Sequence, residues 1–197
     1  MMKIKQLEQE LQQLSTFDQP NILLEQYATS PHIASRMLYV AQNQYEDIQD
    51  RLVADLGAGC GVLSIGALML GAGHVTAFEI DQNAINTILE NCEDEEVAMD
   101  IVNCDVIKLL PGKFEKHFDT VVMNPPFGTK HNAGIDMKFL EIAAAITHVL
   151  KKGEQLGLHA KVLAELRYDL PSTYKFHKKK SVDIEVDFIR FSTKKES

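Results

Sequence analysis

The sequence predicts an α/β fold with a doubly wound, mostly parallel sheet and an antiparallel C-terminal strand. Short apolar runs alternate with segments of helical periodicity from residue 52 to residue 150. A glycine-rich turn directly follows the first apolar run. With 197 residues, 45% of them hydrophobic, the chain has the size and composition of one globular domain. We therefore expect a single domain over 1–197, with an N-terminal helical cap (1–44) and an α/β core (50–197).

Two helices are expected before the first strand. Apolar residues recur at helical spacing over 3–14, as shown by Ile4, Leu7 and Leu11. A second helix is expected over 31–43, because Ser30 can cap it and proline is favoured at the first helical position.

The core is expected to alternate strands and helices. Its strands are predicted at 52–56, 74–79, 97–102 and 118–123. Its helices are predicted at 62–70, 82–91 (capped by Asp81) and 136–150, with a solvated acidic loop at 92–96. Two more strands are expected near 158–168 and 182–191, the second because apolar and polar residues alternate along it.

Composition excludes several classes of protein. No apolar run approaches the roughly 20 residues of a membrane helix, and the amphipathic N-terminus is unlike a signal peptide. We therefore expect no membrane contact and no secretion. Three widely spaced cysteines (Cys60, Cys92 and Cys104) predict neither a disulfide framework nor a metal site. The net charge of −8 limits any nucleic-acid contact to a local patch or a surface shared with a partner.

The glycine turn, Asp55-Leu56-Gly57-Ala58-Gly59-Cys60-Gly61, follows a strand and opens a helix. Glycines let the backbone turn tightly and approach a ligand closely. Cys60 is expected here as a small residue rather than as a nucleophile. The absence of a Gly-Lys-Ser/Thr sequence excludes a P-loop.

Acidic residues follow the next two strands. Glu79 lies 18 positions after Gly61, a spacing at which a carboxylate can accept hydrogen bonds from ribose hydroxyls. Asp105 follows the third strand, where it can accept from an adenine amino group or cap a helix. Ligands of open α/β sheets bind at this edge. The pattern resembles Rossmann-like methyltransferases that use S-adenosyl-L-methionine (SAM) more than nicotinamide dehydrogenases.

The fourth strand runs into Asn124-Pro125-Pro126-Phe127. The prolines end the strand and make the backbone rigid. The side-chain oxygen of Asn124 and the carbonyl of Pro125 can hold the two hydrogens of an amino group and offset the charge that develops on its nitrogen. Phe127 can stack on the planar ring that carries the amino group. This pattern resembles amino-methyltransferases that act on adenine, guanine, cytosine or glutamine.

At greater length the chain resembles the methyltransferase-like protein 5 family, which forms N6-methyladenosine in small-subunit (18S) ribosomal RNA. The resemblance extends from about residue 7 to residue 191 and is carried by LEQYATSPHIASRML, VADLGAGCGVLSIGALMLGAGHV, VVMNPPFGTK and AELRYDLPSTYKFHKKKSVDIEVDFIRF. It implies that Asn124, Pro125, Pro126 and Phe127 are catalytic. The cofactor-binding residues that we expect are Gln26, Tyr27, Thr29, Asp55, Gly57, Gly59, Cys60, Glu79, Ile80, Asp105, Val106 and Asn124.

The resemblance also implies partners. The family works as a heterodimer with a small zinc-binding activator subunit that several methyltransferases share, and we expect the nucleus (nucleolus) and cytoplasm as its location. A basic segment before the last strand fits an RNA substrate, because lysines neutralise phosphates and an aromatic ring can stack on a base. Its residues are Lys175, Phe176, His177, Lys178, Lys179 and Lys180. A solvated hairpin loop is the alternative interpretation of this segment.

One departure from the family concerns the fifth strand, which this chain lacks. The family has a strand and a helix between the segments 136–150 and 158–168, and too few residues lie there for another parallel strand with its crossover. We therefore hypothesise a shortened variant, which is either active or a non-catalytic module that keeps partner or RNA binding. A protein glutamine methyltransferase is the alternative enzyme.

Overall fold

The computed structural model describes residues 2–109, 112–126, 133–147, 159–171 and 181–192. The chain divides into two compact units, Met1–His148 and Val149–Ser197, which we describe separately. That the whole chain acts as one domain stays a prediction.

Four parallel strands form the sheet of the first unit, in the order β3-β2-β1-β4. They are β1 (Leu52–Leu56), β2 (His74–Glu79), β3 (Asp100–Asn103) and β4 (Thr120–Met123). β1 pairs with β2 on one side and with β4 on the other, so that Leu56 lies opposite both Phe78 and Met123. The order therefore reverses beside β1, and the carboxyl ends of β1 and β4 flank the point at which open α/β sheets bind ligands.

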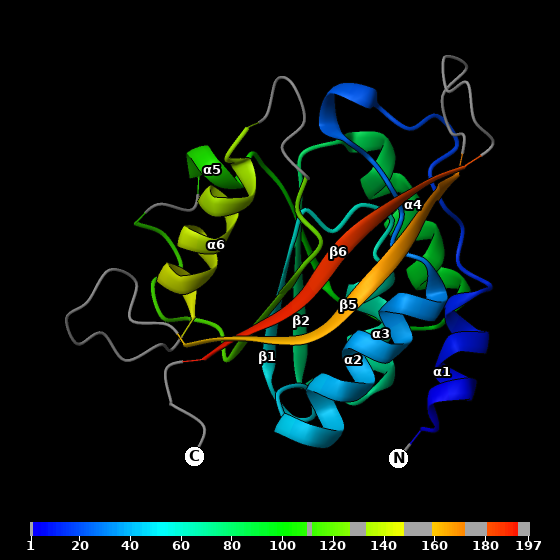
Figure 1. The fold of residues 1–197 in the computed structure, drawn as a ribbon, viewed down its shortest axis with the longest axis horizontal. Coiled ribbons are helices and arrows are strands. Elements are labelled where there is room, and N and C mark those ends of the chain that lie inside the picture. The colour runs from blue at the N-terminus through cyan, green and yellow to red at the C-terminus, as the bar shows by residue number, and fades with distance from the viewer. Residues whose placement is uncertain (1, 110–111, 127–132, 148–158, 172–180, 193–197) are drawn as a thin grey trace. The chain divides into compact units, whose positions relative to one another are not determined.

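Helices cover both faces of this sheet. One face carries α1 (Ile4–Leu11), α2 (Pro31–Tyr45), α3 (Val62–Met69) and α4 (Gln82–Asp94), and the other carries α5 (Val106–Leu109) and α6 (Ile135–Ile146) (Figure 1). Successive residues of β1 alternate between the two faces. Val53 packs among the first group of helices, whereas Ala54 and Leu56 pack with Phe139 of α6. The predicted doubly wound arrangement is confirmed.

Two of the predicted helix caps are confirmed. The Ser30 hydroxyl accepts a hydrogen bond from Ile33 N (3.3 Å), and Pro31 occupies the first position of α2. The Asp81 carboxylate accepts from Asn83 N (3.0 Å) at the start of α4. Between α1 and α2, a single 3₁₀ turn, η1 (Ile22–Leu24), begins at Asn21.

The prediction of an acidic loop at 92–96 is wrong, because α4 continues to Asp94. The helix continues because Asn91 and Cys92 are buried. It ends where Glu96 adopts a left-handed conformation (φ 54°), and Val97 N then bonds to Cys92 O (3.0 Å). This stop places the start of β3 at Asp100 rather than at 97.

Several other boundaries differ from the prediction. α2, for example, ends at Tyr45 rather than at 43. α1 ends at Leu11 rather than at 14, although Leu14 is buried. β4 begins at Thr120 rather than at 118. α6 ends at Ile146 rather than at 150, because Thr147 turns into an extended conformation and bridges Phe118.

The second unit contains β5 (His159–Pro171) and β6 (Ser181–Ser192), which form an antiparallel pair. A register shift interrupts their pairing between Val162 and Ala164. Among the described residues, β4 has β1 as its one strand neighbour, as expected for a sheet without a fifth strand. No helix in the described parts of the chain is long and apolar enough to cross a membrane.

Candidate active site

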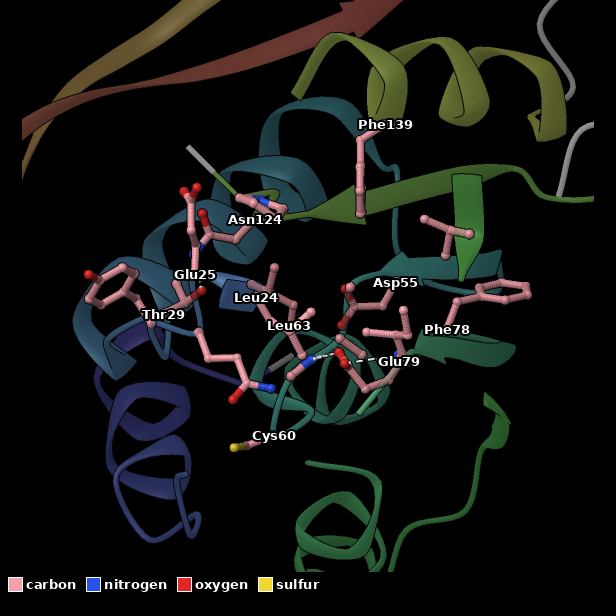
Figure 2. A pocket seen from close by; sticks show the side chains of 18 of the residues that line it. Leu24, Glu25, Thr29, Asp55, Cys60, Leu63, Phe78, Glu79, Asn124 and Phe139 are labelled. Atoms are coloured by element: carbon pink, nitrogen blue, oxygen red, sulfur yellow. Dashed lines mark hydrogen bonds between the residues drawn. The ribbon is translucent and has the colours of Figure 1, made fainter. Parts of the chain in front are cut away.

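A cavity of about 250 Å³ lies at the carboxyl ends of the strands of the first unit. All twelve residues predicted to bind the cofactor line it, as does Pro126 of the predicted catalytic loop. Pro125 is not among the lining residues. Phe127 and the basic segment 175–180 lie outside the described residues. Figure 2 shows Asp55 and Glu79 on one side of the cavity, and Asn124 and Thr29 on the other.

The glycine turn is closely packed from both sides. Gly57 and Gly59 have positive φ angles (72° and 57°), which other residues rarely adopt. A Cβ atom on Gly57 would lie 3.3 Å from Phe139 Cε1, and a Cβ atom on Gly59 would lie 3.0 Å from Phe17 Cζ. Both positions therefore favour glycine for conformation, and a larger residue at either would require the neighbouring ring to shift.

Glu79 holds this turn through its carboxylate. One oxygen accepts from Gly59 N (2.7 Å), and the other accepts from Ile80 N and Asp81 N (both 2.9 Å). Burial raises the pKa of Glu79, and these three donors oppose the increase. An ionised carboxylate has about four acceptor positions, so that one remains for a ligand hydroxyl.

Asp55 is the most deeply buried acid of the cavity. Its Oδ2 accepts from the Ser64 hydroxyl (2.6 Å), whereas its buried Oδ1 has no hydrogen-bond partner among the described residues. Burial raises the pKa of Asp55 to about 7, and the neighbouring charge of Glu79 adds to the increase. A buried carboxylate oxygen without a partner is suited to a ligand that brings an N–H donor or a positive charge.

Asp105 caps α5, which is the alternative that the sequence left open. Its Oδ1 accepts from Ile107 N (3.1 Å), and its Oδ2 lies 2.9 Å from Lys108 Nζ. The Lys108 ammonium group lowers the pKa of Asp105. Asp105 also lines the cavity, so that capping does not preclude a contact with a ligand.

The side of the cavity that carries Asn124 is bonded to the segment between η1 and α2. Asn124 Nδ2 donates to Thr29 Oγ1 (2.9 Å). Gln26 Nε2 donates to Asp81 Oδ2 (2.7 Å), and Gln26 Oε1 accepts from Asn21 N (2.7 Å). The segment therefore joins the loop after β2 to the loop after β4.

Cys60 is a buried wall residue of the cavity. Burial raises its pKa to about 12, and the nearby carboxylates of Glu79 and Asp81 add to the increase. A thiol with such a pKa stays protonated at neutral pH, and a protonated thiol is a poor nucleophile.

Several residues of the site were not predicted from the sequence. Phe17 and Phe139 pack against the glycine turn although neither belongs to a motif. Asn91 is buried on α4, where its amide bonds to Ser15 N (2.8 Å), Ser15 O (3.0 Å) and Cys60 O (3.0 Å). In the sequence, the structural role of Asn91 is indicated only by its position as a polar residue on the apolar face of a predicted helix.

Comparison with known proteins assigns the family. The family model of the methyltransferase small domain matches residues 29–175. The rRNA N(6)-adenosine-methyltransferase METTL5 of Danio rerio is 53% identical over 206 aligned positions, which cover 97% of this chain and 99% of the relative. The chain belongs to the METTL5 family. A Drosophila melanogaster member, rRNA N(6)-adenosine-methyltransferase Mettl5, is 49% identical and covers 96% of both chains.

The fold agrees with this assignment. The crystal structure of the protein PH1948 from Pyrococcus horikoshii matches with a TM-score of 0.79 and 35% identity, over 98% of each chain. The METTL5 family is a family of methyltransferases, and its Rossmann-like fold implies SAM as the methyl donor. The 206 positions aligned with the Danio rerio member exceed the 197 residues of this chain, so that relative contains residues without a counterpart here.

Proposed function

We propose that this chain transfers a methyl group from SAM to the N6 atom of an adenosine in small-subunit (18S) ribosomal RNA. One observation carries the proposal: Asp55, Glu79 and Asn124, from the ends of three strands, line one cavity in a member of the METTL5 family. Two of these residues suit the cofactor and one suits an amino group, so that donor and acceptor meet in the same space.

The residues present fit the cofactor. The free acceptor position of Glu79 would accept a hydrogen bond from a ribose hydroxyl of the cofactor, and Oδ1 of Asp55 would accept one from the amino group of its methionine part. Asp105 would accept from the adenine amino group between the side chains of Ile80 and Val106, which line the same cavity. The bound cofactor supplies a methyl group on a positively charged sulfur atom.

Asn124 and Pro125 would hold the acceptor nitrogen. The Asn124 Oδ1 and the Pro125 carbonyl would each accept one N6 hydrogen, which aims the nitrogen lone pair at the methyl carbon. The nitrogen–carbon bond forms as the carbon–sulfur bond breaks, and the electron pair of the broken bond stays on the sulfur of S-adenosylhomocysteine. The methylated nitrogen then loses one proton to water, so that no strong base is required. Phe127 would stack on the adenine ring.

The RNA substrate must present an unstacked adenosine. A base inside a helix cannot reach Asn124, so the target is single-stranded or is flipped out of its stack. The basic segment Lys175–Lys180 would bind the RNA backbone in this otherwise acidic chain.

A heterodimer with the zinc-binding activator subunit and a location in the nucleus (nucleolus) and cytoplasm belong to this proposal. They rest on the family resemblance and not on any residue of the cavity. Co-purification of the two subunits from one expression host would test the heterodimer directly.

The decisive experiment is methyl transfer from labelled SAM to small-subunit ribosomal RNA, with the chain and the activator subunit co-expressed. The product is digested to nucleosides, and the Asn124→Ala variant is the control. Label in N6-methyladenosine that the variant does not produce supports the proposal. Label in a protein fraction, sensitive to protease and resistant to nuclease, would instead identify a glutamine methyltransferase.

A shortened, non-catalytic form is the second candidate function. The observation in its favour is that β4, which carries Asn124 at its end, has β1 as its one strand neighbour among the described residues. A folded chain that binds the activator subunit or RNA without methyl transfer would establish this form. A longer chain with a fifth strand inserted after α6 should then regain transfer.

A further inference from the structure

We propose that Ser64 is a positioning residue for the methyl donor, because its hydroxyl holds the Asp55 carboxylate with one oxygen available to the amino group of SAM. This inference rests on the proposed function, which places that amino group on Oδ1 of Asp55. It extends the site to a described side chain that is not among the residues lining the cavity.

Ser64 is a polar residue in an apolar part of the sequence. It lies on α3, in the run Val62–Ala67, where every residue is buried. A buried hydroxyl is unfavourable unless it forms a hydrogen bond, and alanine stabilises a helix better than serine. Packing of the core alone would therefore favour alanine at this position, which directs attention to the hydrogen bond that Ser64 makes.

The hydrogen bond of Ser64 goes to the buried acid of the cavity. Its hydroxyl donates to Asp55 Oδ2 over 2.6 Å, and Asp55 is only 1% exposed. An ionised carboxylate has acceptors only, so that the hydroxyl must be the donor and the bond has one possible direction. Hydrogen bonds to a charged acceptor are among the stronger ones in proteins.

This bond leaves the other carboxylate oxygen for a ligand. With Oδ2 occupied, rotation of the Asp55 carboxylate about its last side-chain bond is restricted, and Oδ1 has no partner among the described residues. Asp55 lines the cavity, and Figure 2 shows its carboxylate directed into it. A positively charged amino group can therefore bind to Oδ1 without the entropic cost of ordering the carboxylate.

The charge of Asp55 also depends on Ser64. Burial raises the pKa of Asp55, and the Glu79 carboxylate, which is the charged group that acts on it among the described residues, raises it further. The hydroxyl and the backbone N–H of Ser64 oppose the increase. Ser64 thus favours the ionised form of Asp55, which is the form that pairs with a positive charge.

The first test compares two ligands that differ in the amino group. S-adenosylhomocysteine carries it, whereas 5′-methylthioadenosine shares the nucleoside and lacks the amino-acid part. We expect Ser64→Ala to raise the Kd of S-adenosylhomocysteine by about tenfold, as for one hydrogen bond to a charged group, and to change the Kd of 5′-methylthioadenosine by less than about twofold. Ser64→Thr keeps the hydroxyl and should bind S-adenosylhomocysteine within about threefold of the wild type. Calorimetry measures both ligands without turnover.

The matched control is Ser35→Ala. Ser35 is also a fully buried helical serine, and its hydroxyl donates to His32 O (3.1 Å) on α2, away from the lining residues of the cavity. Both affinities should stay within about twofold of the wild type in this variant. If Ser64→Ala does not fold, Ser64→Cys, which has a weak donor in nearly the same volume, takes its place with the same direction of change.

A different division of the effects would overturn the inference. Equal losses of affinity for the two ligands in Ser64→Ala would show a general distortion of the site. An unchanged Kd of S-adenosylhomocysteine would show that the bond to Asp55 does not serve the ligand. If folded Ser64→Thr binds as weakly as Ser64→Ala, the hydroxyl is not the group that matters.

The second test removes the carboxylate. In an Asp55→Ala background Ser64 has no carboxylate to hold, so that the further change Ser64→Ala should alter the Kd of S-adenosylhomocysteine by less than about twofold. With Asp55 present, Ser64→Ala should move the loss of affinity at acid pH to higher pH, because removal of the donor raises the pKa of Asp55. Equal losses in the two backgrounds, or an unchanged pH profile, would contradict the positioning role.

These binding measurements separate the inference from the proposed function. A wild-type chain that binds S-adenosylhomocysteine and transfers no methyl group to RNA would refute the proposed function and leave the role of Ser64 intact. A chain that methylates RNA, but in which Ser64→Ala binds both ligands as the wild type does, would refute the inference alone.

Discussion

The two sides of the cavity are built differently. On the cofactor side, Glu79 accepts three backbone N–H groups and Asp55 bonds to Ser64, all from residues within about 20 positions. On the substrate side, Asn124 makes its side-chain contact with Thr29, which lies 95 residues away. The carboxylates of Glu79 and Asp55 are thus held by several groups nearby in the sequence, whereas among the described residues the Asn124 side chain bonds to one distant residue.

Because the two sides are held differently, we expect changes on each side to affect different measurable quantities. Changes on the cofactor side should appear in SAM affinity and in folding stability, because their partners are backbone groups of the turn. Changes on the substrate side should appear in the rate of transfer, because the proposed function places Asn124 against the reacting nitrogen. A change on the cofactor side that lowered only the rate of transfer, or a change on the substrate side that lowered only SAM affinity, would contradict this distinction.

The largest effect is expected for Asn124→Ala. Under the proposed function this variant loses the oxygen that stabilises the developing charge, which should lower kcat by about 100-fold or more. The Kd of SAM, measured by calorimetry, should stay within about threefold of the wild type. A loss of SAM affinity that matches the loss of rate would show that Asn124 serves the cofactor side as well.

Glu79→Gln should have the next largest effect, and it should change the affinity for SAM rather than kcat. The amide has the same shape but turns an N–H donor towards backbone donors, and it loses the charge that ribose hydroxyls prefer. The Kd of SAM should rise by about 10- to 100-fold, the equivalent of hydrogen bonds to a charged group. Glu90→Gln, at an exposed position of α4, is the matched control and should change nothing.

Asn91→Ala tests whether the cofactor side is held through the N-terminal segment. Removal of its amide leaves Cys60 O and both backbone groups of Ser15 without their partner. We expect a loss of about 2 kcal/mol in the free energy of unfolding, measured in urea. Asn86→Ala removes an exposed bond with Gln82 on the same helix and should cost much less. Equal losses in the two variants would contradict the role of Asn91.

Near neutral pH, the smallest effect is the pH dependence that Asp55 creates. Its pKa is raised to about 7. Below this pH the Asp55 carboxyl is protonated, and it must lose its proton before it can pair with a positively charged group of the ligand. The Kd of SAM should therefore rise below pH 7, by up to about tenfold per pH unit, and Asp55→Asn should flatten this dependence.

The same pKa shift has a consequence for folding. The folded chain holds the Asp55 proton more tightly than the unfolded chain, so that the free energy of unfolding should fall as pH rises from about 4 to about 7. Urea unfolding of the wild type and of Asp55→Asn across this range measures the difference. A wild-type slope that Asp55→Asn leaves unchanged would assign the pH dependence to other groups.

Local patterns predicted the elements that local chemistry controls. β1 and β2 have the predicted bounds, because apolar runs bounded by glycine and acidic residues leave few alternatives. The end of α4 was missed because the left-handed position that stops it holds Glu96, where glycine or asparagine is the usual signal. The residues expected at the cavity line it for the same reason that they were found: parallel strands deliver their carboxyl ends to one edge.

Contacts between distant segments could not be predicted from spacing. Phe17 and Phe139 approach the glycine turn from helices and loops whose packing no motif encodes. Thr29 and Asn124 were both assigned to the site, yet the hydrogen bond between them emerges only once the N-terminal segment is folded over β1 and β4. These contacts arise from tertiary packing, which the periodicity of the sequence does not reveal.

The span between Thr29 and Asn124 also determines when the enzyme becomes competent during folding. Closing a loop of 95 residues costs about 4 kcal/mol of chain entropy, more than a single hydrogen bond returns. The contact can therefore form only after α1 and α2 have docked on α3 and β4 has joined the sheet. During synthesis, 95 further residues must be added after Thr29 before its partner exists. The contact between Thr29 and Asn124 therefore requires the first unit to be folded, whereas Gly59 of the glycine turn bonds to Glu79, only 20 positions away.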